Sequence, residues 1–355
     1  MRRFLMSAAF CAIACGGGVR AGNAPPSSVP TVTTGSAEGD QQIAELGTCA
    51  LDSGQTIEEC RIGYRTYGKL NADKSNVVLW PTWFTGTTAK LAFVPKDLVD
   101  TKKFFLVLVD SLGNGISSAP SSSRTQPRLK FPKFTIHDMV ESQRRLLRET
   151  LKIDKPVVVM GISMGGMQSF EWAVSHPEEV KRIIPIVGSP QLTSQDLLLW
   201  NAELDLLDGS KQYADGEYRD RPRIPALQEL HWLNLTTPAH RNSETSRAAF
   251  AAFQAEKGGD TSFDWNDWHR QLEAMIAHDV ARNDGGDLAA AARRVKARGL
   301  VIVAEQDHMV NPETSKRFAA LMNAKLFVTN TSCGHMAPGC EPLIASEVRK
   351  FLDEP

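Results

Sequence analysis

Residues 157–166 have the sequence VVVMGISMGG, in which apolar residues lead directly into Gly-x-Ser-x-Gly. The apolar run predicts a buried parallel strand, and residues 164–175 predict a helix that ends at His176-Pro177. A strand, a sharp turn and a helix form the setting of a nucleophile elbow. Glycines there remove clashing Cβ atoms, and the serine hydroxyl stands clear of the sheet. Ser163 is therefore predicted to be a nucleophile; the alternative is an ordinary strand–helix turn.

Length and composition limit the classes of protein to consider. The chain has 355 residues, a hydrophobic content of 42% and a net charge of −1. This length suits one large α/β domain with an insertion. A near-neutral charge gives no electrostatic reason to expect nucleic acid or an anionic membrane surface as a partner. The sequence has no cluster with metal-ligand spacing and no glycine-rich phosphate loop, so we expect no metal and no cofactor.

The N-terminal segment predicts export. Residues 1–21 contain two arginines, a short apolar run and then small residues, which is the order of a signal peptide. Residues 19–21 suit an ordinary signal peptidase, whereas residues 12–15 suit a lipobox in which Cys15 is lipidated. We expect a secreted or periplasmic protein, held at a membrane only if Cys15 carries a lipid. Residues 22–40, rich in Pro, Ser, Thr and Gly, predict a flexible tether.

Four cysteines remain after signal removal, and their spacing suggests disulfides in an oxidising compartment. Cys49 and Cys60 flank a turn between two strand-like runs, where a cross-strand bridge is plausible. Cys333 and Cys340 bracket His335, and we predict that they also pair. The alternative is four free, buried thiols.

Strands alternating with helices predict an α/β fold with a mostly parallel sheet and helices on both faces. The predicted strands are 43–51, 57–67, 77–80, 104–109, 157–163, 183–187, 300–304 and 326–328. The predicted core helices are 135–151, 164–175, 313–323 and 342–352. Between residues 191 and 298 the pattern is helical, with segments 194–207, 226–235, 243–256 and 265–282. The core is thus expected at 41–190 and 299–355, with a helical cap inserted at 191–298.

A nucleophilic serine needs a base to take its proton and an acid to orient that base. In an α/β-hydrolase the chain order is Ser, Asp or Glu, then His, and each partner follows a late strand. Asp307 and His335 follow the last two predicted strands, so the predicted triad is Ser163, Asp307 and His335. Asp307 has an alternative role as an acid near the start of the next helix, and His308 is a rival base. The other candidates, His137, His176 and His278, lie in or at the ends of helical stretches and are expected at the surface.

The tetrahedral intermediate of acyl transfer needs backbone N–H donors. Met164, directly after the nucleophile, and Phe84, in the loop after an early strand, are the predicted oxyanion-hole residues. Phe84 could instead be a pocket wall, and the two roles are compatible because only its N–H is needed. The rest of the substrate pocket is expected to include Trp83, Thr85, Gly86 and Met336. The apolar members of this set favour a short or medium apolar acyl chain.

Residues 161–168 (GISMGGMQ), with Glu171-Trp172-Ala173, resemble the homoserine O-acetyltransferase family of α/β-hydrolase-fold proteins. The same resemblance appears in residues 134–140 (FTIHDMV), Thr85-Gly86, Asp307 ahead of Pro312-Glu313, and Gly334-His335. It covers most of the chain after the N-terminal segment and is weakest in the cap. It implies an α/β-hydrolase fold, the triad and oxyanion assignments above, and often a dimer formed through the cap helices.

Two departures from that family favour water as the acyl acceptor. Family transferases carry Arg in an Asn-Glu-x-Gln-Arg stretch of the first cap helix, where this chain has NAELD at 201–205 and thus Asp205. They also carry Asp after the catalytic His, where this chain has Met336. The sequence therefore predicts a secreted serine ester hydrolase acting on small esters through an acyl-enzyme. The alternatives are an O-acyltransferase that uses acetyl-CoA and, from another class, a non-catalytic binding protein. The apolar run Leu197–Trp200 predicts a homodimer through the cap.

Overall fold

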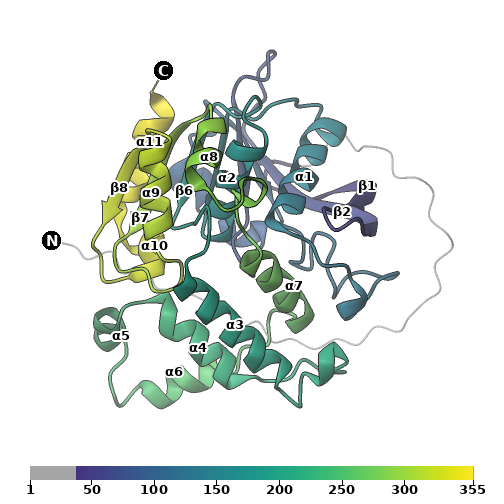
Figure 1. Ribbon diagram of the computed structural model, residues 1–355, viewed down its shortest axis with the longest axis vertical. Helices are drawn as coiled ribbons and strands as arrows, with labels where there is room; N and C mark the ends of the chain where they lie inside the picture. Colours follow the sequence, from purple (N-terminus) through teal and green to yellow (C-terminus); the bar gives the residue numbers. More distant parts are fainter. Residues whose placement is uncertain (1–36, 355) are drawn as a thin grey trace. The chain divides into compact units, whose positions relative to one another are not determined.

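An eight-stranded sheet organises residues 37–354, the part of the chain that this computed structural model describes (Figure 1). The strands are β1 (Gln42–Ala50), β2 (Thr56–Tyr67), β3 (Val77–Pro81), β4 (Phe105–Val109), β5 (Val158–Ile162), β6 (Arg182–Ile186), β7 (Arg298–Ala304) and β8 (Lys325–Thr329). Their order is β1-β2-β4-β3-β5-β6-β7-β8. Strand β2 runs antiparallel to both neighbours, and the other pairs are parallel. The mostly parallel sheet is confirmed. The predicted export signal and most of the tether lie outside the described residues.

The core helices follow the predicted positions closely, and the cap helices less so. The helices are α1 (Ile136–Arg145), α2 (Met164–Ser175), α3 (Ser194–Asp208), α4 (Pro225–Leu235), α5 (Pro238–Glu244), α6 (Phe250–Lys257), α7 (Trp265–Ile276), α8 (Leu288–Arg294), α9 (Glu313–Leu321), α10 (Ala337–Cys340) and α11 (Pro342–Asp353). The single helix predicted at 243–256 is wrong. Thr237 caps α5 and Pro238 occupies its first turn, so that helix begins earlier and ends at Glu244. The helix predicted at 265–282 ends at Ile276, and α8 was not predicted.

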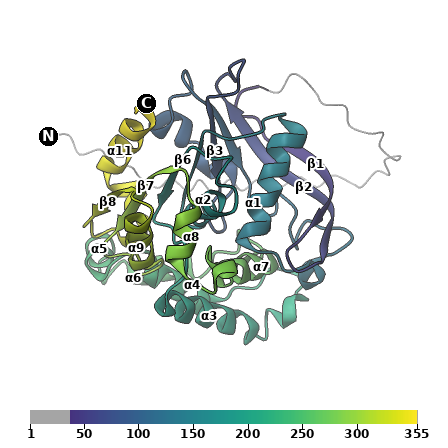
Figure 2. The same ribbon diagram turned by 45° about the horizontal axis from the view of Figure 1, so that its top comes forward.

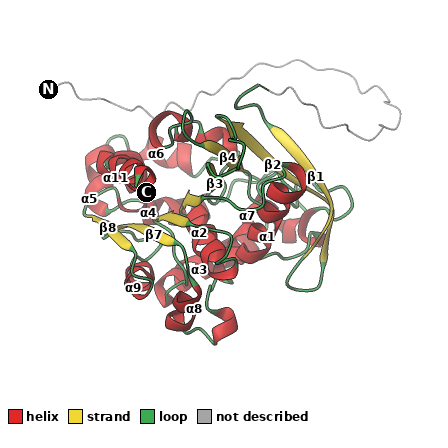
Figure 3. Cartoon of the chain, turned by 90° about the horizontal axis from the view of Figure 1, so that it is seen from above, coloured by secondary structure: helices red, strands yellow, loops and turns green. Residues whose placement is uncertain are grey.

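The central parallel strands are buried on both faces, and their successive side chains point to opposite sides of the sheet, whereas the edge strand β8 is largely exposed. Leu79, Val107 and Val159 belong to the core on the face covered by α1, α2, α8 and α9. Their neighbours in sequence, such as Val78 and Val158, pack on the other face with α11 and a short π-helical turn, Val94–Leu98. Figure 3 shows α9 and α11 on opposite sides of β7 and β8. The sheet is therefore the middle layer of a three-layer core, with helices on both faces. Continuous apolar strands require such cover on both sides.

The segment between β6 and β7 holds α3 to α8, and α3 to α6 lie together at the lower side of Figures 1 and 2. Helix α7 joins this cap to the core: the Arg270 guanidinium donates to the backbone oxygens of Phe131 and Leu129. Asp196 and Thr193 form a capping box at the start of α3. No helix within residues 37–354 is long and apolar enough to cross a membrane.

Two disulfides join the cysteines in the predicted pairs. Cys49–Cys60 connects β1 to β2, and Cys333–Cys340 connects the segment before His335 to α10. Both prediction and structure thus place a covalent link beside His335. That link encloses the short 3-10 turn Gly334–Met336.

Candidate active site

Ser163 occupies a sharp, strained turn between β5 and α2. Its φ of 58° lies in the left-handed region, which a residue other than glycine adopts only at a cost. A Cβ atom on Gly161 would lie 2.6 Å from the carbonyl carbon of Gly165, and one on Gly165 would lie 2.7 Å from the backbone oxygen of Pro81. Only glycine fits at either position, so the turn can bring the start of α2 against the end of β3.

Three side chains from distant parts of the chain form one hydrogen-bonded line. His335 Nε2 lies 2.9 Å from Ser163 Oγ, and His335 Nδ1 lies 2.7 Å from Asp307 Oδ2. All three residues are buried. The remaining Asp307 oxygen, Oδ1, accepts the backbone N–H groups of Met309 and Val310, each at 2.9 Å. An ionised Asp307 fixes the proton of His335 on Nδ1, which leaves Nε2 free to accept the serine proton.

The alternatives considered for these positions do not fit the geometry. Asp307 does not cap α9, because its hydrogen bonds go to the loop before that helix and to His335. His308 is exposed.

Two backbone N–H groups near the serine have no protein acceptor within residues 37–354. Met164 is the first residue of α2, and Phe84 lies in the loop after β3; neither N–H donates a hydrogen bond. The Gln168 amide, from α2, donates to Thr82 O in that same loop at 3.2 Å. The arrangement thus brings unpaired donors from both predicted oxyanion-hole residues to adjoining segments.

Buried polar side chains hold the loop that carries Phe84. The sequence analysis did not identify them. Asp110 Oδ1 accepts the Thr88 N–H at 2.8 Å, and the Asn114 amide donates to both Asp110 and Gly86 O. Gln271 of α7 accepts the N–H of Thr85 at 2.9 Å. Asp110 directly follows the buried strand β4, and Asn114 lies in the loop just after it, a position that the sequence makes visible. Gln271 lies 186 residues from Thr85, and no local pattern indicates that contact.

The cap is bonded to the turns that carry Asp307 and His335. Asp196 of α3 accepts the Asn311 N–H at 2.8 Å, and the Thr237 hydroxyl donates to Ser332 O at 2.6 Å. A Cβ on Gly334, whose φ is 59°, would lie 3.3 Å from the Thr236 Cα. The cap therefore supports the turns that carry the acid and the base of the hydrogen-bonded line.

The predicted pocket residues occupy different environments. Trp83 is half-buried and stacks on Phe93, with ring centroids 6.4 Å apart, while Met336 is 44% exposed. Asp205, which was expected to stand where the family transferases carry Arg, lies on the exposed face of α3. The acid on the inward face of that helix is instead Glu203, which is fully buried. Residues two positions apart in a helix differ by about 200° around its axis. An error of two positions in the alignment therefore exchanges the inner and outer faces.

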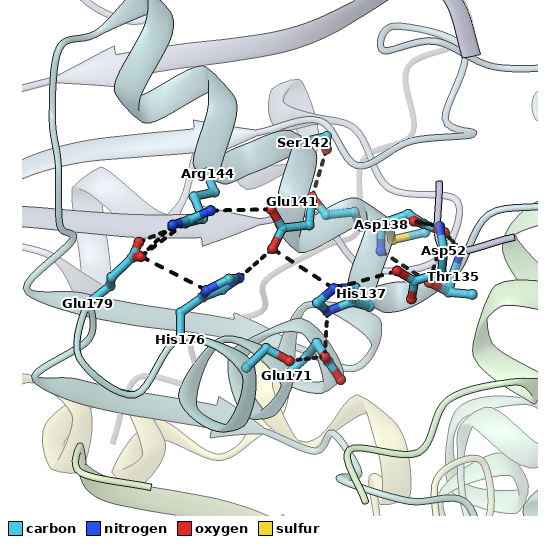
Figure 4. A network of polar contacts seen from close by, with 12 residues as sticks. Asp52, Thr135, His137, Asp138, Glu141, Ser142, Arg144, Glu171, His176 and Glu179 are labelled. Atoms are coloured by element: carbon cyan, nitrogen blue, oxygen red, sulfur yellow. Dashed lines mark hydrogen bonds and ion pairs between the residues drawn. The ribbon is translucent and has the colours of Figure 1, made fainter. Parts of the chain in front are cut away.

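The histidines expected at the surface are instead buried or half-buried in polar contacts, and Figure 4 shows those of His137 and His176. His137 Nδ1 lies 2.8 Å from Glu171 Oε1, and Glu171 also accepts Arg282 at 2.9 Å. Burial raises the pKa of Glu171, but the bonds from His137 and Arg282 outweigh it and lower the pKa to about 2. His176 contacts Glu141, and His278 is buried against Ser189 O. These residues tie α1 and α2 to the chain that leaves the cap.

Asp267 of α7 is a buried acid in a different situation. Its carboxylate accepts the N–H and the hydroxyl of Ser121, and both donors are uncharged. Burial raises the pKa of Asp267 to about 7, in spite of these bonds. Within residues 37–354, no group of three or more His, Cys, Asp or Glu side chains is placed to hold a metal ion.

Comparisons with known proteins agree with this fold. A family model for the alpha/beta hydrolase fold matches residues 77–339. A probable esterase of Corynebacterium glutamicum is 30% identical over 320 residues, which cover 85% of this chain and 91% of that protein. An ethyl acetate hydrolase of Pseudomonas veronii is 30% identical over 285 residues, which cover 76% of this chain and 81% of that protein.

Transferases are also among the relatives. A homoserine O-acetyltransferase of Acidiphilium cryptum is 29% identical over 318 residues, which cover 77% of this chain and 83% of that protein. The crystal structure of an acetylester hydrolase from Corynebacterium glutamicum has a TM-score of 0.82 and 28% identity, covering 89% of this chain and 96% of that one. The chain therefore belongs to the alpha/beta hydrolase fold family, and within it to the enzymes related to esterases and homoserine O-acetyltransferases.

Proposed function

We propose that the protein is a serine ester hydrolase that forms an acyl-enzyme on Ser163 and transfers the acyl group to water. The observation that carries this proposal is the line Asp307–His335–Ser163, with contacts of 2.7 and 2.9 Å, beside two unpaired backbone N–H groups. A nucleophile, an oriented base and donors for the oxyanion are the parts that acyl transfer needs.

In the first half of the reaction, Ser163 Oγ attacks the ester carbonyl carbon while its proton moves to His335 Nε2. The N–H groups of Phe84 and Met164 stabilise the negative charge that develops on the carbonyl oxygen. The C–O bond to the alcohol then breaks, and the alcohol leaves with the proton from His335. Asp307 stabilises the imidazolium without taking its proton. In the second half, water attacks the acyl-enzyme carbonyl carbon while His335 Nε2 takes a proton from it. The bond from that carbon to Ser163 Oγ then breaks, Oγ receives the proton from His335, and the acid is released.

The charges of the cap residues favour water over an amino acid as the acyl acceptor. A carboxylate brought into a closed pocket must be paired with a positive charge. The buried face of α3 carries acids, Asp196 and Glu203, and no basic residue. The arginines that could replace the missing cation lie elsewhere: Arg219, Arg221 and Arg223 are exposed. Met336 offers no charge to a substrate ammonium group.

The names of two relatives, an ethyl acetate hydrolase and an acetylester hydrolase, support acetyl esters as the first substrates to test. The enzyme is incubated with a series of p-nitrophenyl esters from acetate to octanoate. Parallel samples receive acetyl-CoA and homoserine and are assayed for free thiol and O-acetylhomoserine. We expect ester hydrolysis and no O-acetylhomoserine. Transfer to homoserine at a rate comparable to hydrolysis would replace this proposal with the acyltransferase.

We also propose that the protein is exported. The support is the signal-like segment at residues 1–21 together with two disulfides, which persist mainly in oxidising compartments. Intact-mass analysis of protein from the native host distinguishes cleavage after Ala21 from a lipidated Cys15. A full-length chain recovered from the cytoplasm would refute export.

A homodimer through the cap is a further proposal. Leu198 of α3 is 69% exposed and Leu233 of α4 is 72% exposed, so both cap helices present large apolar side chains to solvent. Light scattering at micromolar concentration is expected to give a dimer, and Leu198→Asp is expected to shift it to monomer. A wild-type monomer would refute the proposal.

A further inference from the structure

Three cap side chains surround the ring of Phe84. Trp200 of α3, His231 of α4 and Trp268 of α7 have ring centroids 6.2, 5.9 and 4.7 Å from that of Phe84. His231 and Trp268 also contact each other, with centroids 4.9 Å apart. We call Trp200, His231 and Trp268 the cap cluster. It covers the residue whose backbone N–H is proposed to meet the substrate carbonyl.

The cap cluster contains two buried hydrogen-bond donors without acceptors. Trp200 and Trp268 are 2% and 4% exposed, and neither indole N–H has a partner within the described residues 37–354. Two other buried indoles are paired: Trp172 donates to Gln143, and Trp265 donates to Pro222 O. A buried donor without an acceptor is unfavourable, because it has lost its hydrogen bonds to water. An acceptor atom brought to these indoles is therefore expected to bind more favourably than a hydrocarbon group.

His231 adds a third polar group to the cluster. Glu203, whose side chain is fully buried, lies 3.1 Å from His231 Nδ1, which places the proton of a neutral imidazole on that nitrogen. The opposite nitrogen, Nε2, has no hydrogen-bond partner in the part of the chain that is described. It can accept a hydrogen bond from a hydroxyl group. The cap cluster thus combines aromatic walls with two free donors and one free acceptor.

We propose that the cap cluster is the subsite for one side of the ester, and that it selects a group bearing an oxygen atom over a hydrocarbon group of equal size. Hydroxyl, ether and carbonyl oxygens can all accept from Trp200 and Trp268, and a hydroxyl can also donate to His231. A purely hydrocarbon group fills the same space but leaves both indoles unpaired. The inference rests on the proposed function, because the oxyanion role of Phe84 places the reacting carbonyl beside this cluster.

The test uses ester pairs in which one CH₂ group is exchanged for oxygen. For the acyl side the pair is p-nitrophenyl methoxyacetate and p-nitrophenyl butyrate; for the alcohol side it is 2-methoxyethyl acetate and butyl acetate. The ratio of kcat/KM within each pair is measured for the wild type, Trp200→Phe and Trp268→Phe. Comparing variants on the same pair cancels the intrinsic reactivity of the esters. Each substitution removes one N–H and keeps an aromatic ring.

The chain offers a matched control in Trp80. Its indole N–H is also buried and unpaired, but it belongs to the core on the opposite face of the sheet. We expect Trp200→Phe or Trp268→Phe to reduce the preference for the oxygen-bearing ester roughly tenfold in one of the two pairs, the value of one hydrogen bond. The pair that responds identifies the side of the ester that binds there. Trp80→Phe should leave both ratios unchanged.

Unchanged ratios in both cap variants, or an equal change in Trp80→Phe, would overturn the inference while leaving the hydrolase intact. Melting temperatures establish that each variant is folded, and the two cap tryptophans provide independent measurements. Loss of butyrate hydrolysis in Ser163→Ala separates enzymatic turnover from background. If the wild type hydrolyses none of the four esters, both the proposed function and this inference are refuted.

Discussion

Imidazole–carboxylate contacts occur near both ends of α2, and they differ in what the second imidazole nitrogen meets. In the first, His335 Nδ1 faces Asp307 at 2.7 Å and Nε2 faces the Ser163 hydroxyl. In the second, His137 Nδ1 faces Glu171 at 2.8 Å, and Nε2 lies 3.7 Å from an Asp52 oxygen and 3.9 Å from a Glu141 oxygen. One histidine lies between an acid and a hydroxyl, and the other lies among three acids.

This difference separates the proposed proton shuttle, His335, from His137, whose surroundings favour the protonated ring. A hydroxyl can give a proton to Nε2 and take it back, whereas surrounding carboxylates only stabilise the protonated ring. Burial lowers the pKa of His137, but Glu171 and Asp52 outweigh it and the pKa is raised. The Arg282 guanidinium also donates a hydrogen bond to Glu171, so a second positive charge lies beside that carboxylate. The carboxylate–histidine pair therefore does not define an active site; the partner of the second nitrogen does.

Removal of the nucleophile should have the largest effect. Ser163→Ala or His335→Ala is expected to lower kcat by roughly 10⁴-fold or more, and the double variant should be no worse, because the groups act as a unit. Hydrolysis of p-nitrophenyl acetate measures the loss, and an unchanged melting temperature shows that the fold is kept. Wild-type turnover in either single variant would refute the assignment.

Asp307→Asn should come next. The amide cannot hold the His335 proton on Nδ1 as a carboxylate does, so kcat is expected to fall by roughly 10⁴-fold through the wrong tautomer. Stability should change little by comparison. A kcat within tenfold of wild type would mean that His335 is oriented by something other than Asp307.

Glu171→Gln makes in the Glu171–His137 pair the same acid-to-amide change as Asp307→Asn makes in the Asp307–His335 pair. Its effect should appear in the free energy of unfolding. Glu171 is fully buried and balances His137 and Arg282. Removing one partner of a buried charge set costs about 3–5 kcal/mol. Urea unfolding should reveal this loss, while kcat of the folded variant stays close to wild type. A loss of kcat as large as that of Asp307→Asn would contradict the separation drawn between the two pairs.

Dependence on pH sharpens the comparison between Glu171, with charged partners, and Asp267, with uncharged ones. The pKa of Glu171 is lowered from 4.5 to about 2, so its contribution to stability is present above pH 4.5 and is lost as pH falls towards 2. The pKa of Asp267 is raised from 3.8 to about 7, so its contribution is present below pH 3.8 and is lost as pH rises through 7.

Asp267→Asn should therefore reduce the fall in stability between pH 4 and pH 7, because the uncharged amide does not titrate. Urea unfolding of wild type and variant at several pH values in this interval measures the two slopes. Identical slopes would show that Asp267 does not titrate in this range.

The smallest expected effect concerns the disulfides. Replacing Cys333 and Cys340 by serine opens a short loop and should cost no more than about 3 kcal/mol of stability. Because that loop carries His335, kcat should fall as well. The Cys49/Cys60 double serine variant is the control, since it opens a comparable loop between β1 and β2. Equal effects on kcat would mean that the Cys333–Cys340 link does not position His335.

The sequence predicted those parts of the site that follow strands. Ser163 and Asp307 each come just after a buried apolar strand, and His335 follows the largely exposed edge strand β8. Parallel strands bring such positions to one edge of the sheet. The cap offered no such rule. The side chain that faces inward on a cap helix depends on helical phase, so Asp205 was expected where Glu203 lies. Bonds such as Asn311 to Asp196, 115 residues apart, leave no local pattern.

The buried polar network around His137 was missed for a related reason. A histidine in a helix is usually exposed, and only the tertiary fold shows that Glu171 and Arg282 meet it. Residues 134–140 and Glu171 were noted through family resemblance without a physical role. The structure supplies that role, because these residues join α1 to α2.

The bonds from the cap to the core have a consequence for protein engineering. Asp196 holds the turn after Asp307, and Thr237 holds the turn before His335. A cap grafted from a relative would have to supply an acid and a hydroxyl at these two positions, or the recipient would lose the alignment of its own reacting groups. Recombination of whole caps is thus constrained in this chain. New substrate ranges are more accessible through single replacements at Trp200, His231 or Trp268, which leave both anchors in place.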